Sequence, residues 1–226
     1  MTDKSSPRLE FSEKYTEMHA KEYFHKHQAG FWRRLSNWRE ISIARKALRM
    51  AGNPASVLDL PSGTGRFWEL LCERPDRKIY AADNSRNMFE TGMQLRPAEV
   101  TRRIETFQCS AFDIPLPDNA VENIFCMRLV HHIGKSEDRV ALFREFRRVA
   151  SQSVCLSLWV DGNVQARRRL RMERKRTKKP YQNRFVVPRA QVESEFREAG
   201  MEITGYIDFL GFYSIWRVYV LNTAGR

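Results

Sequence analysis

The chain has 226 residues, of which 42% are hydrophobic and 12% aromatic, and its 39 Lys or Arg against 27 Asp or Glu give a net charge of +12. This length and apolar content predict one packed domain and exclude a disordered chain. The first residues are polar, and no apolar run approaches the roughly 20 residues that span a bilayer. We therefore expect a cytoplasmic protein without a secretory or integral membrane segment.

Cysteine and histidine spacing gives little support for a metal site. The four cysteines are scattered through apolar stretches with no C-x-x-C pair, which is typical of buried thiols in a reducing compartment. Only His25 with His27, and His131 with His132, come near the close spacing that metal ligands need. We expect no metal.

The first predicted element is a helix in the N-terminal quarter of the chain. Apolar residues recur there at steps of three and four between Phe31 and Met50, as they do on one face of a helix. The run Gly52, Asn53 and Pro54 should end it. We expect residues 1–54 to form a helical cap or lid, and residues 55–226 to form the main domain.

From residue 55 onward, strand-like and helix-like stretches alternate. Helices are predicted over residues 66–73, after Ser85 to about Leu95, and from Ser136 onward. Short apolar strands are predicted between them, over residues 55–60, 78–82, 104–109, 121–127 and 153–160. Such alternation indicates a parallel sheet with helices on both faces. A ligand should bind at the carboxyl ends of the strands.

The pattern changes after the fifth strand. A basic insertion occupies about residues 161–187, a helix is predicted near residues 189–199, and strand-like runs follow at 202–209 and 212–221. Only two residues separate these runs, which is too short for a crossover helix, so they should pair antiparallel. The predicted fold is α/β, with a Rossmann-like seven-stranded sheet that is mostly parallel and has one antiparallel strand near the C-terminus.

The turn after the first strand argues against a dinucleotide. A G-x-G-x-x-G fingerprint is broken, because Trp68 stands in the third position when it is read from Gly63, and Pro61 stands in the first when it is read from there. A pyrophosphate needs that close backbone approach. Gly63 and Gly65 instead leave room for a ligand without phosphate. Pro61 is tolerated, since at a strand end its missing N–H need not break a ladder bond.

Four segments at successive strand ends carry a family resemblance. They are DLPSGTG (residues 59–65), ADNSRNM (82–88), CSAFDIPLPD (109–118) and FCMRLVHHI (125–133). In this order they resemble the class I S-adenosylmethionine-dependent methyltransferases, and within them the small-molecule and quinone-biosynthesis-type branch. The resemblance is strong over about residues 55–160. It implies S-adenosyl-L-methionine as the cofactor and methyl transfer as the reaction.

The resemblance also implies which residues bind the cofactor. The Gly63 and Gly65 turn would lie under the methionyl part, and Asp59 would orient the turn or the cofactor's amino group. Asp83 offers two acceptor oxygens for the ribose hydroxyls; its alternative role as a helix cap is weakened by Ser85, which can fill that position. The full implied set is Asp59, Pro61, Gly63, Gly65, Asp83, Asn84, Met88, Ala111, Phe112 and Met127.

The adenine contacts are the part of this set with the most open alternatives. Met88 would pack on the adenine, although an apolar residue on a helix face is more often part of the core. Ala111 and Phe112 would flank the ring. The family usually has an acid before that alanine, and Ser110 stands in its place here. We therefore leave residue 110 out of the predicted adenine contacts.

Catalysis of methyl transfer depends mainly on positioning the acceptor. A hydroxyl or activated carbon acceptor also benefits from a general base, and histidine suits neutral pH. His132, with its neighbour His131, follows the fourth strand where the resemblance puts the acceptor pocket; the alternative is a structural histidine. Tyr15, His19 and Tyr23 are candidates for a lid over the cofactor, or they simply pack.

One basic run holds most of the excess charge. It begins at Arg167, ends at Lys179 and contains nine Lys or Arg and one Glu, so that without it the net charge falls from +12 to +4. The run is either a solvated helix face or an anion site. Its partners would be RNA phosphates, anionic lipid headgroups or a phosphorylated glycolipid.

The choice of acceptor follows from two missing features. No separate RNA-reading domain is apparent, and no N-P-P-Y type motif follows the fourth strand. These absences favour a small or amphiphilic acceptor, handled at the inner membrane face, over RNA. RNA methylation through the basic run and a non-catalytic binding protein with the same fold are the alternatives.

Overall fold

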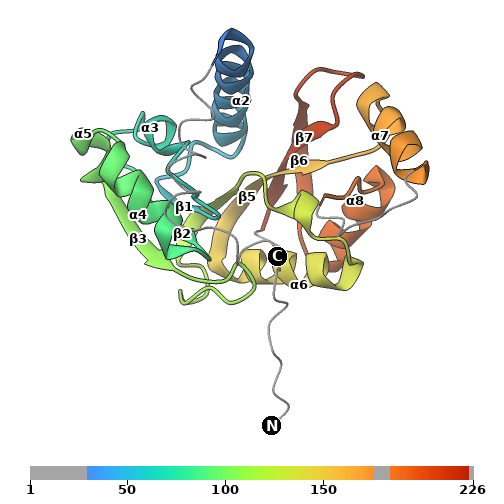
Figure 1. Ribbon diagram of the computed structural model, residues 1–226. Coiled ribbons are helices and arrows are strands. Elements are labelled where there is room, and N and C mark those ends of the chain that lie inside the picture. Colours follow the sequence, from blue (N-terminus) through green and yellow to red (C-terminus); the bar gives the residue numbers. More distant parts are fainter. Residues whose placement is uncertain (1–29, 176–183, 224–226) are drawn as a thin grey trace.

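A seven-stranded sheet forms the centre of the computed structural model, which describes residues 30–175 and 184–223 (Figure 1). The strand order is β3-β2-β1-β4-β5-β7-β6. The strands are β1 (Ser56–Asp59), β2 (Lys78–Asp83), β3 (Ile104–Gln108), β4 (Val121–Cys126), β5 (Ala150–Trp159), β6 (Glu202–Asp208) and β7 (Trp216–Asn222). Strands β1 to β5 are parallel, and β7 runs antiparallel to both β5 and β6. The predicted fold class is confirmed.

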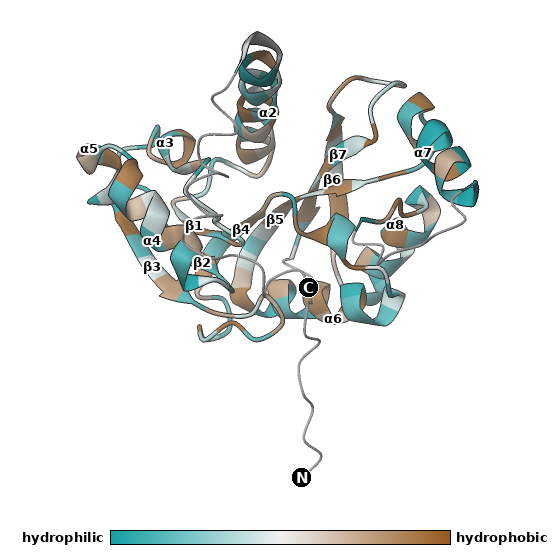
Figure 2. Ribbon diagram, in the orientation of Figure 1, coloured by the Kyte–Doolittle hydropathy of each residue, from teal (hydrophilic) through white to brown (hydrophobic). Residues whose placement is uncertain are grey.

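Helices cover both faces of this sheet. They are α2 (Phe31–Met50), α3 (Trp68–Leu71), α4 (Arg86–Leu95), α5 (Ala98–Thr101), α6 (Ser136–Val149), α7 (Val164–Arg174) and α8 (Arg189–Glu198), with a short 3₁₀ helix, η2 (Val130–His132). One core cluster joins α6 and α8 to one face, and a second joins α2 and α3 to the other. The strands between these helices consist largely of apolar residues, whereas α7 is mostly hydrophilic (Figure 2).

The predicted N-terminal helix is present as α2. It ends where expected, because Gly52 and Asn53 adopt φ values of +80° and +51° that leave the helical region. Ile43, Ala44, Ala47 and Leu48 are buried against the sheet. The candidate lid residues Tyr15, His19 and Tyr23, and the pair His25 and His27, lie outside the described residues.

Two predicted elements are shorter than expected. The helix expected over residues 66–73 is only α3, because Gly65 has φ +70° and Phe67 lies at φ −102°, ψ 1°, outside a regular helix. The strand expected from residue 212 starts at Trp216, because residues 210–214 form a turn in which the Tyr213 and Ser214 N–H groups bond the carbonyl of Leu210. The connection between β6 and β7 therefore spans residues 209–215, and its backbone carbonyls accept from the first turn of α7.

The four cysteines were expected to be buried thiols. Cys109, Cys126 and Cys155 are buried and Cys72 is partly exposed, and all four are free.

None of the helices in the described parts of the chain has the length and apolar character needed to cross a membrane.

Candidate cofactor and acceptor site

The turn after β1 is tied to the end of β2 by two backbone groups. The Ser62 N–H donates to the carbonyl of Ala82 at 2.8 Å, and the Gly63 N–H donates to Asp83 Oδ2 at 3.0 Å. Gly63 and Gly65 have φ values of +55° and +70°. A Cβ on Gly65 would lie 2.4 Å from the Trp68 ring, so this position needs both the freedom and the small size of glycine.

The Asp83 carboxylate, at the end of β2, holds two backbone N–H groups. Besides Gly63, it accepts from the Ser85 N–H at 2.9 Å, while the Ser85 side chain makes no capping hydrogen bond. Ser85 is the N-cap residue of α4 as expected, but its side chain does not cap the first turn, and the Asp83 carboxylate instead holds the backbone N–H of Ser85 itself. Each carboxylate oxygen keeps a second lone pair for a further donor.

Burial raises the pKa of Asp83 to about 6, and the hydrogen bonds from the Ser85 and Gly63 backbone oppose that rise. The group is 8% exposed, so it faces solvent only at its edge. An ionised Asp83 can accept two hydroxyl protons, whereas a protonated one cannot accept both. Its acceptor capacity is thus sensitive to pH near neutrality.

Asp59, the last residue of β1, is a buried carboxyl group whose nearest donor is the ring N–H of Trp68. It is 0% exposed, and neither oxygen accepts a well-formed hydrogen bond from any residue in the described ranges. Burial raises its pKa well above the ordinary value, the negative charge of Asp83 raises it further, and the Trp68 N–H lowers it only in part. Burying an unpaired acid is costly. A cationic donor from a ligand would remove that cost.

Met88, which was predicted to pack on the adenine, lies beside the glycine turn. Its Cε is 3.7 Å from the position that a Cβ on Gly63 would take, and the residue is buried on α4. Ala111 is buried after β3, and the Phe112 N–H donates to Ser110 Oγ at 3.2 Å. Pro61 is half-buried and Asn84 is exposed. The structure thus joins Asp59, Gly63, Asp83 and Met88 around one turn, with the other predicted residues following neighbouring strand ends.

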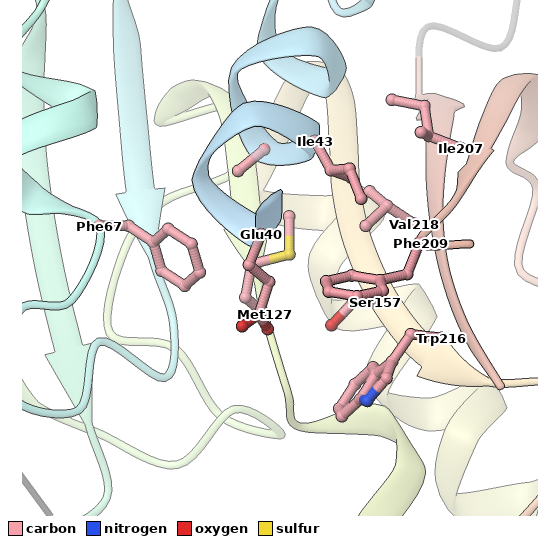
Figure 3. A pocket seen from close by; sticks show the side chains of 10 residues that line it. Glu40, Ile43, Phe67, Met127, Ser157, Ile207, Phe209, Trp216 and Val218 are labelled. Atoms are coloured by element: carbon pink, nitrogen blue, oxygen red, sulfur yellow. The ribbon is translucent and has the colours of Figure 1, made fainter. Parts of the chain in front are cut away.

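A cleft lies between α2, the ends of β4 and β5, and strands β6 and β7, and Phe67, which follows the glycine turn, also lines it (Figure 3). The side chains of Glu40, Met127, Phe209 and Trp216 point into the same space. The lining is mostly apolar and consists of Glu40, Ile43, Ala44, Phe67, Met127, Ser157, Ile207, Phe209, Trp216 and Val218. Of the predicted site residues, only Met127 lines this cleft.

Sequence reasoning missed the rest of the lining because it comes from distant segments. Glu40 belongs to the helix that covers the sheet, and Phe209 and Trp216 flank a connection that was expected to be two residues long. The only available signal was the alternation of aromatic residues in the C-terminal runs, and it does not show which of them face a cleft.

An ion cluster at the wall of the cleft was also missed. The Glu40 carboxylate pairs with Arg66, which follows the glycine turn, and with Arg128 at 3.3 Å, which follows β4. Arg128 has φ +71°, and its N–H donates to Ser157 Oγ at 2.8 Å. The cluster ties α2 to the two turns that border the cleft.

The two candidate histidines differ in environment. His131 is 2% exposed, and its ring lies 5.0 Å from that of Trp159 and 4.8 Å from that of Trp216. Burial lowers the pKa of His131 to about 2. So weak a base does not suit proton abstraction near neutral pH, and the catalytic role expected for His131 is replaced by a packing role. His132 is half-buried, with its ring 4.1 Å from that of His131, and neither histidine lines the cleft.

Metal-ligating side chains do not cluster in the described ranges. No group of three or more His, Cys, Asp or Glu is arranged there to hold an ion.

The fold and the site define a class of protein. A Rossmann-like sheet with β7 inserted antiparallel beside β5, together with a glycine turn after β1 and an acid at the end of β2, is the arrangement of a class I methyltransferase. Residues 57–153 match the family model described as a methyltransferase domain. No curated protein matches the chain.

Solved structures share this fold. A magnesium protoporphyrin IX methyltransferase from Synechocystis, crystallised with S-adenosylhomocysteine, is 12% identical, with a TM-score of 0.67 over 86% of this chain and 88% of that one. A SAM-dependent methyltransferase from Aquifex aeolicus is 20% identical, with a TM-score of 0.62 over 92% and 99%. Residues 57–153 thus carry a methyltransferase domain, and the solved structures share its fold. The quinone-biosynthesis-type branch stays a prediction.

The residues at the turn fit this cofactor. Asp59 supplies a buried carboxylate for an ammonium group, Asp83 keeps free lone pairs for hydroxyl donors, and the turn lacks side chains at Gly63 and Gly65. S-adenosylmethionine carries an ammonium group and ribose hydroxyls, and it has no phosphate.

Proposed function

We propose that this enzyme transfers a methyl group from S-adenosylmethionine to a small or amphiphilic acceptor bound in the cleft beside Met127, Phe209 and Trp216. The single observation that carries the proposal is the mostly apolar lining of this cleft, which includes Phe67 after the glycine turn and Met127 after β4 at the ligand edge of the sheet. Apolar walls with a few polar groups suit a compact organic molecule. They do not suit a strand of charged phosphates.

The proposed cofactor roles follow the geometry of the turn. Asp59 receives the amino group, and the Gly63 and Gly65 backbone lies against the methionyl part. Asp83 accepts from the ribose hydroxyls through the lone pairs that Gly63 and Ser85 leave open. Met88, Ala111 and Phe112 pack around the adenine, with Asn84 and Pro61 at the border of the site.

The proposed chemistry requires little more than positioning. When bound, the cofactor supplies an electrophilic methyl group on a sulfonium. The residues of the cleft hold the acceptor atom in line with that methyl and exclude water, and Glu40 is held in place by its ion pairs with Arg66 and Arg128. We propose that His132 orients the acceptor's proton from the border of the cleft. It does not line the cleft itself, but its ring lies 4.1 Å from that of His131, which in turn lies 4.8 Å from the ring of the lining residue Trp216.

RNA is the second candidate acceptor. The observation in its favour is the basic surface of α7, on which Arg167, Arg168, Arg171 and Arg174 are exposed. This surface suits any polyanion, however, and no described feature reads a base. The third candidate is a non-catalytic binding protein with the same fold. Only a measurement of methyl transfer distinguishes it from an enzyme.

The test is incubation with radiolabelled S-adenosylmethionine and a cell extract separated into small molecules, lipids, RNA and protein. We expect label in the small-molecule or lipid fraction. We expect Phe209→Ala to lower kcat/KM roughly tenfold or more, because the acceptor loses an apolar wall, while its affinity for S-adenosylhomocysteine stays unchanged. Leu95→Ala, at an exposed position on α4, is the matched control.

Label in the RNA fraction would replace the proposal with the second candidate. Normal binding of S-adenosylhomocysteine with no label transferred to any fraction would favour the non-catalytic reading.

A further inference from the structure

Exposed apolar side chains gather on three elements at the ligand edge of the sheet. We call them the apolar rim, and its members are Leu35 and Trp38 on α2, Leu210, Phe212 and Tyr213 in the β6–β7 connection, and Leu170 and Met172 on α7. Phe212 is 84% exposed and Trp38 is 64% exposed. Figure 1 shows α2, the β6–β7 connection and α7 projecting from the sheet in the same direction.

Hydrogen bonds to backbone carbonyls hold these three elements together. The Arg39 Nε–H on α2 donates to the carbonyl of Phe209 at 3.1 Å, where the connection begins. The Val164 and Gln165 N–H groups at the start of α7 donate to the carbonyls of Phe212 and Tyr213, each at 3.1 Å. These hydrogen bonds join α2 and α7 to the two ends of one connection, which begins at Phe209 of the cleft lining.

The helix α7, which carries part of the apolar rim, is strongly basic. In α7, Arg167, Arg168, Arg171 and Arg174 are exposed, and none of them forms an ion pair with another described residue. Ala166 is the only fully buried residue of this helix. The one acid of α7, Glu173, pairs with Arg169, so the helix presents nearly uniform positive charge. The last four residues of the basic run, 176–179, lie outside the described residues.

We propose that the apolar rim and the exposed arginines of α7 form a peripheral membrane-binding surface that docks on anionic phospholipid. Leu, Met, Phe and Trp side chains gain free energy on entering the boundary between headgroups and acyl chains, and arginines are attracted to anionic headgroups. The apolar side chains match the apolar interior of such a membrane, and the arginines match its negative charge. This proposal of a membrane-binding surface does not depend on whether the methyl acceptor is itself a lipid.

The composition of the rim favours lipid over RNA. Single-stranded nucleic acid is held by aromatic faces on which bases stack. Four of the seven rim residues, Leu35, Leu170, Met172 and Leu210, are aliphatic, and their exposure is explained by a partner with an apolar interior. RNA would use the arginines and leave the aliphatic side chains in water.

The test is sedimentation of the full chain with vesicles of phosphatidylcholine alone, or of equal parts phosphatidylcholine and phosphatidylglycerol. We expect binding to the anionic vesicles that weakens with added salt, and little binding to the neutral ones. Leu210→Ser with Phe212→Ser should weaken it at least tenfold, and so should Arg168→Glu with Arg171→Glu. Thermal unfolding and binding of S-adenosylhomocysteine, measured on every variant, show that the fold is intact.

Matched controls lie away from the rim. Met93→Ser with Leu95→Ser removes exposed apolar side chains from α4, and Arg102→Glu with Arg197→Glu makes the same change in net charge. Both should bind vesicles like the unmodified protein. Failure to bind anionic vesicles would overturn the proposal, as would serine variants that bind them normally. Tight, salt-sensitive binding of single-stranded RNA that the serine variants retain, without vesicle binding, would assign the surface to RNA. None of these outcomes depends on methyl transfer.

Discussion

The carboxylate of Asp83 has two roles. It holds the Gly63 and Ser85 N–H groups, which fixes the glycine turn against the start of α4, and its remaining lone pairs face the site. The same burial that limits solvent around the group raises its pKa to about 6. A single residue thus links the local backbone geometry to the protonation state of the proposed ribose contact.

We expect the affinity for S-adenosylhomocysteine to fall as the pH falls through about 6, because protonation removes an acceptor from the ribose hydroxyls. At pH about 5, with about a tenth of the group ionised, binding should be up to about tenfold weaker than at pH about 8. Calorimetric titration across this range measures it. Asp83→Asn should bind weakly at every pH. A flat profile for the unmodified protein would contradict the assignment.

The stability of the ligand-free protein should change in the opposite direction. Since the folded pKa of Asp83 lies above the unfolded value of 3.8, its protonation favours the folded state. That contribution to the free energy of unfolding is fully present below the unfolded value and is lost as the pH rises through about 6. Asp59, whose pKa is also raised, acts in the same direction.

At the scale of elements, a buried ion pair joins α6 to α8. Arg139 Nε and Nη2 bond the two oxygens of Glu195 at 2.8 and 2.5 Å, and both side chains are almost fully buried. Arg139 also donates to the carbonyls of Ile133 and Gly134, each at 3.0 Å, just after η2. The pair therefore anchors the segment that carries the two histidines.

We expect Arg139→Met to lower the free energy of unfolding by about 3–5 kcal/mol, because it leaves Glu195 as an uncompensated buried charge. The double variant Arg139→Met with Glu195→Leu should recover much of that loss. Urea unfolding of both single variants and the double variant measures the coupling. A double variant no more stable than the single ones would show that the pair is not coupled as described.

At the scale of the whole molecule, the parallel strands bring distant motifs to one edge. The turns after β1 and β2 and the segments after β3 and β4 meet there, although they span residues 59–133 of the chain. Helix α2 closes the edge from one side through the Glu40 cluster with Arg66 and Arg128. Ligand binding should therefore stabilise the fold as a unit.

S-adenosylhomocysteine at about 100 times its Kd should add about 2.7 kcal/mol to the free energy of unfolding. For a chain of this size that corresponds to a rise in Tm of roughly 5–10 °C. Differential scanning fluorimetry measures the shift. Asp59→Asn should show little shift, and NAD should give none, because the turn lacks the fingerprint that a pyrophosphate needs. A shift with NAD equal to that with S-adenosylhomocysteine would contradict the site.

The sequence by itself determined the order of elements, the fold class and the glycine turn with its two acids, because apolar periodicity, chain breaks and strand-end motifs are local. It also placed Met88 and Met127 near the site, since the carboxyl ends of parallel strands share an edge. Only the tertiary structure decided that His131 is buried against Trp159 and Trp216, that Asp83 holds the N–H groups of both Gly63 and Ser85, and that Glu40, Phe209 and Trp216 line the cleft. Those facts depend on contacts between residues that are far apart in the chain, and on burial that shifts pKa values, neither of which a local pattern contains.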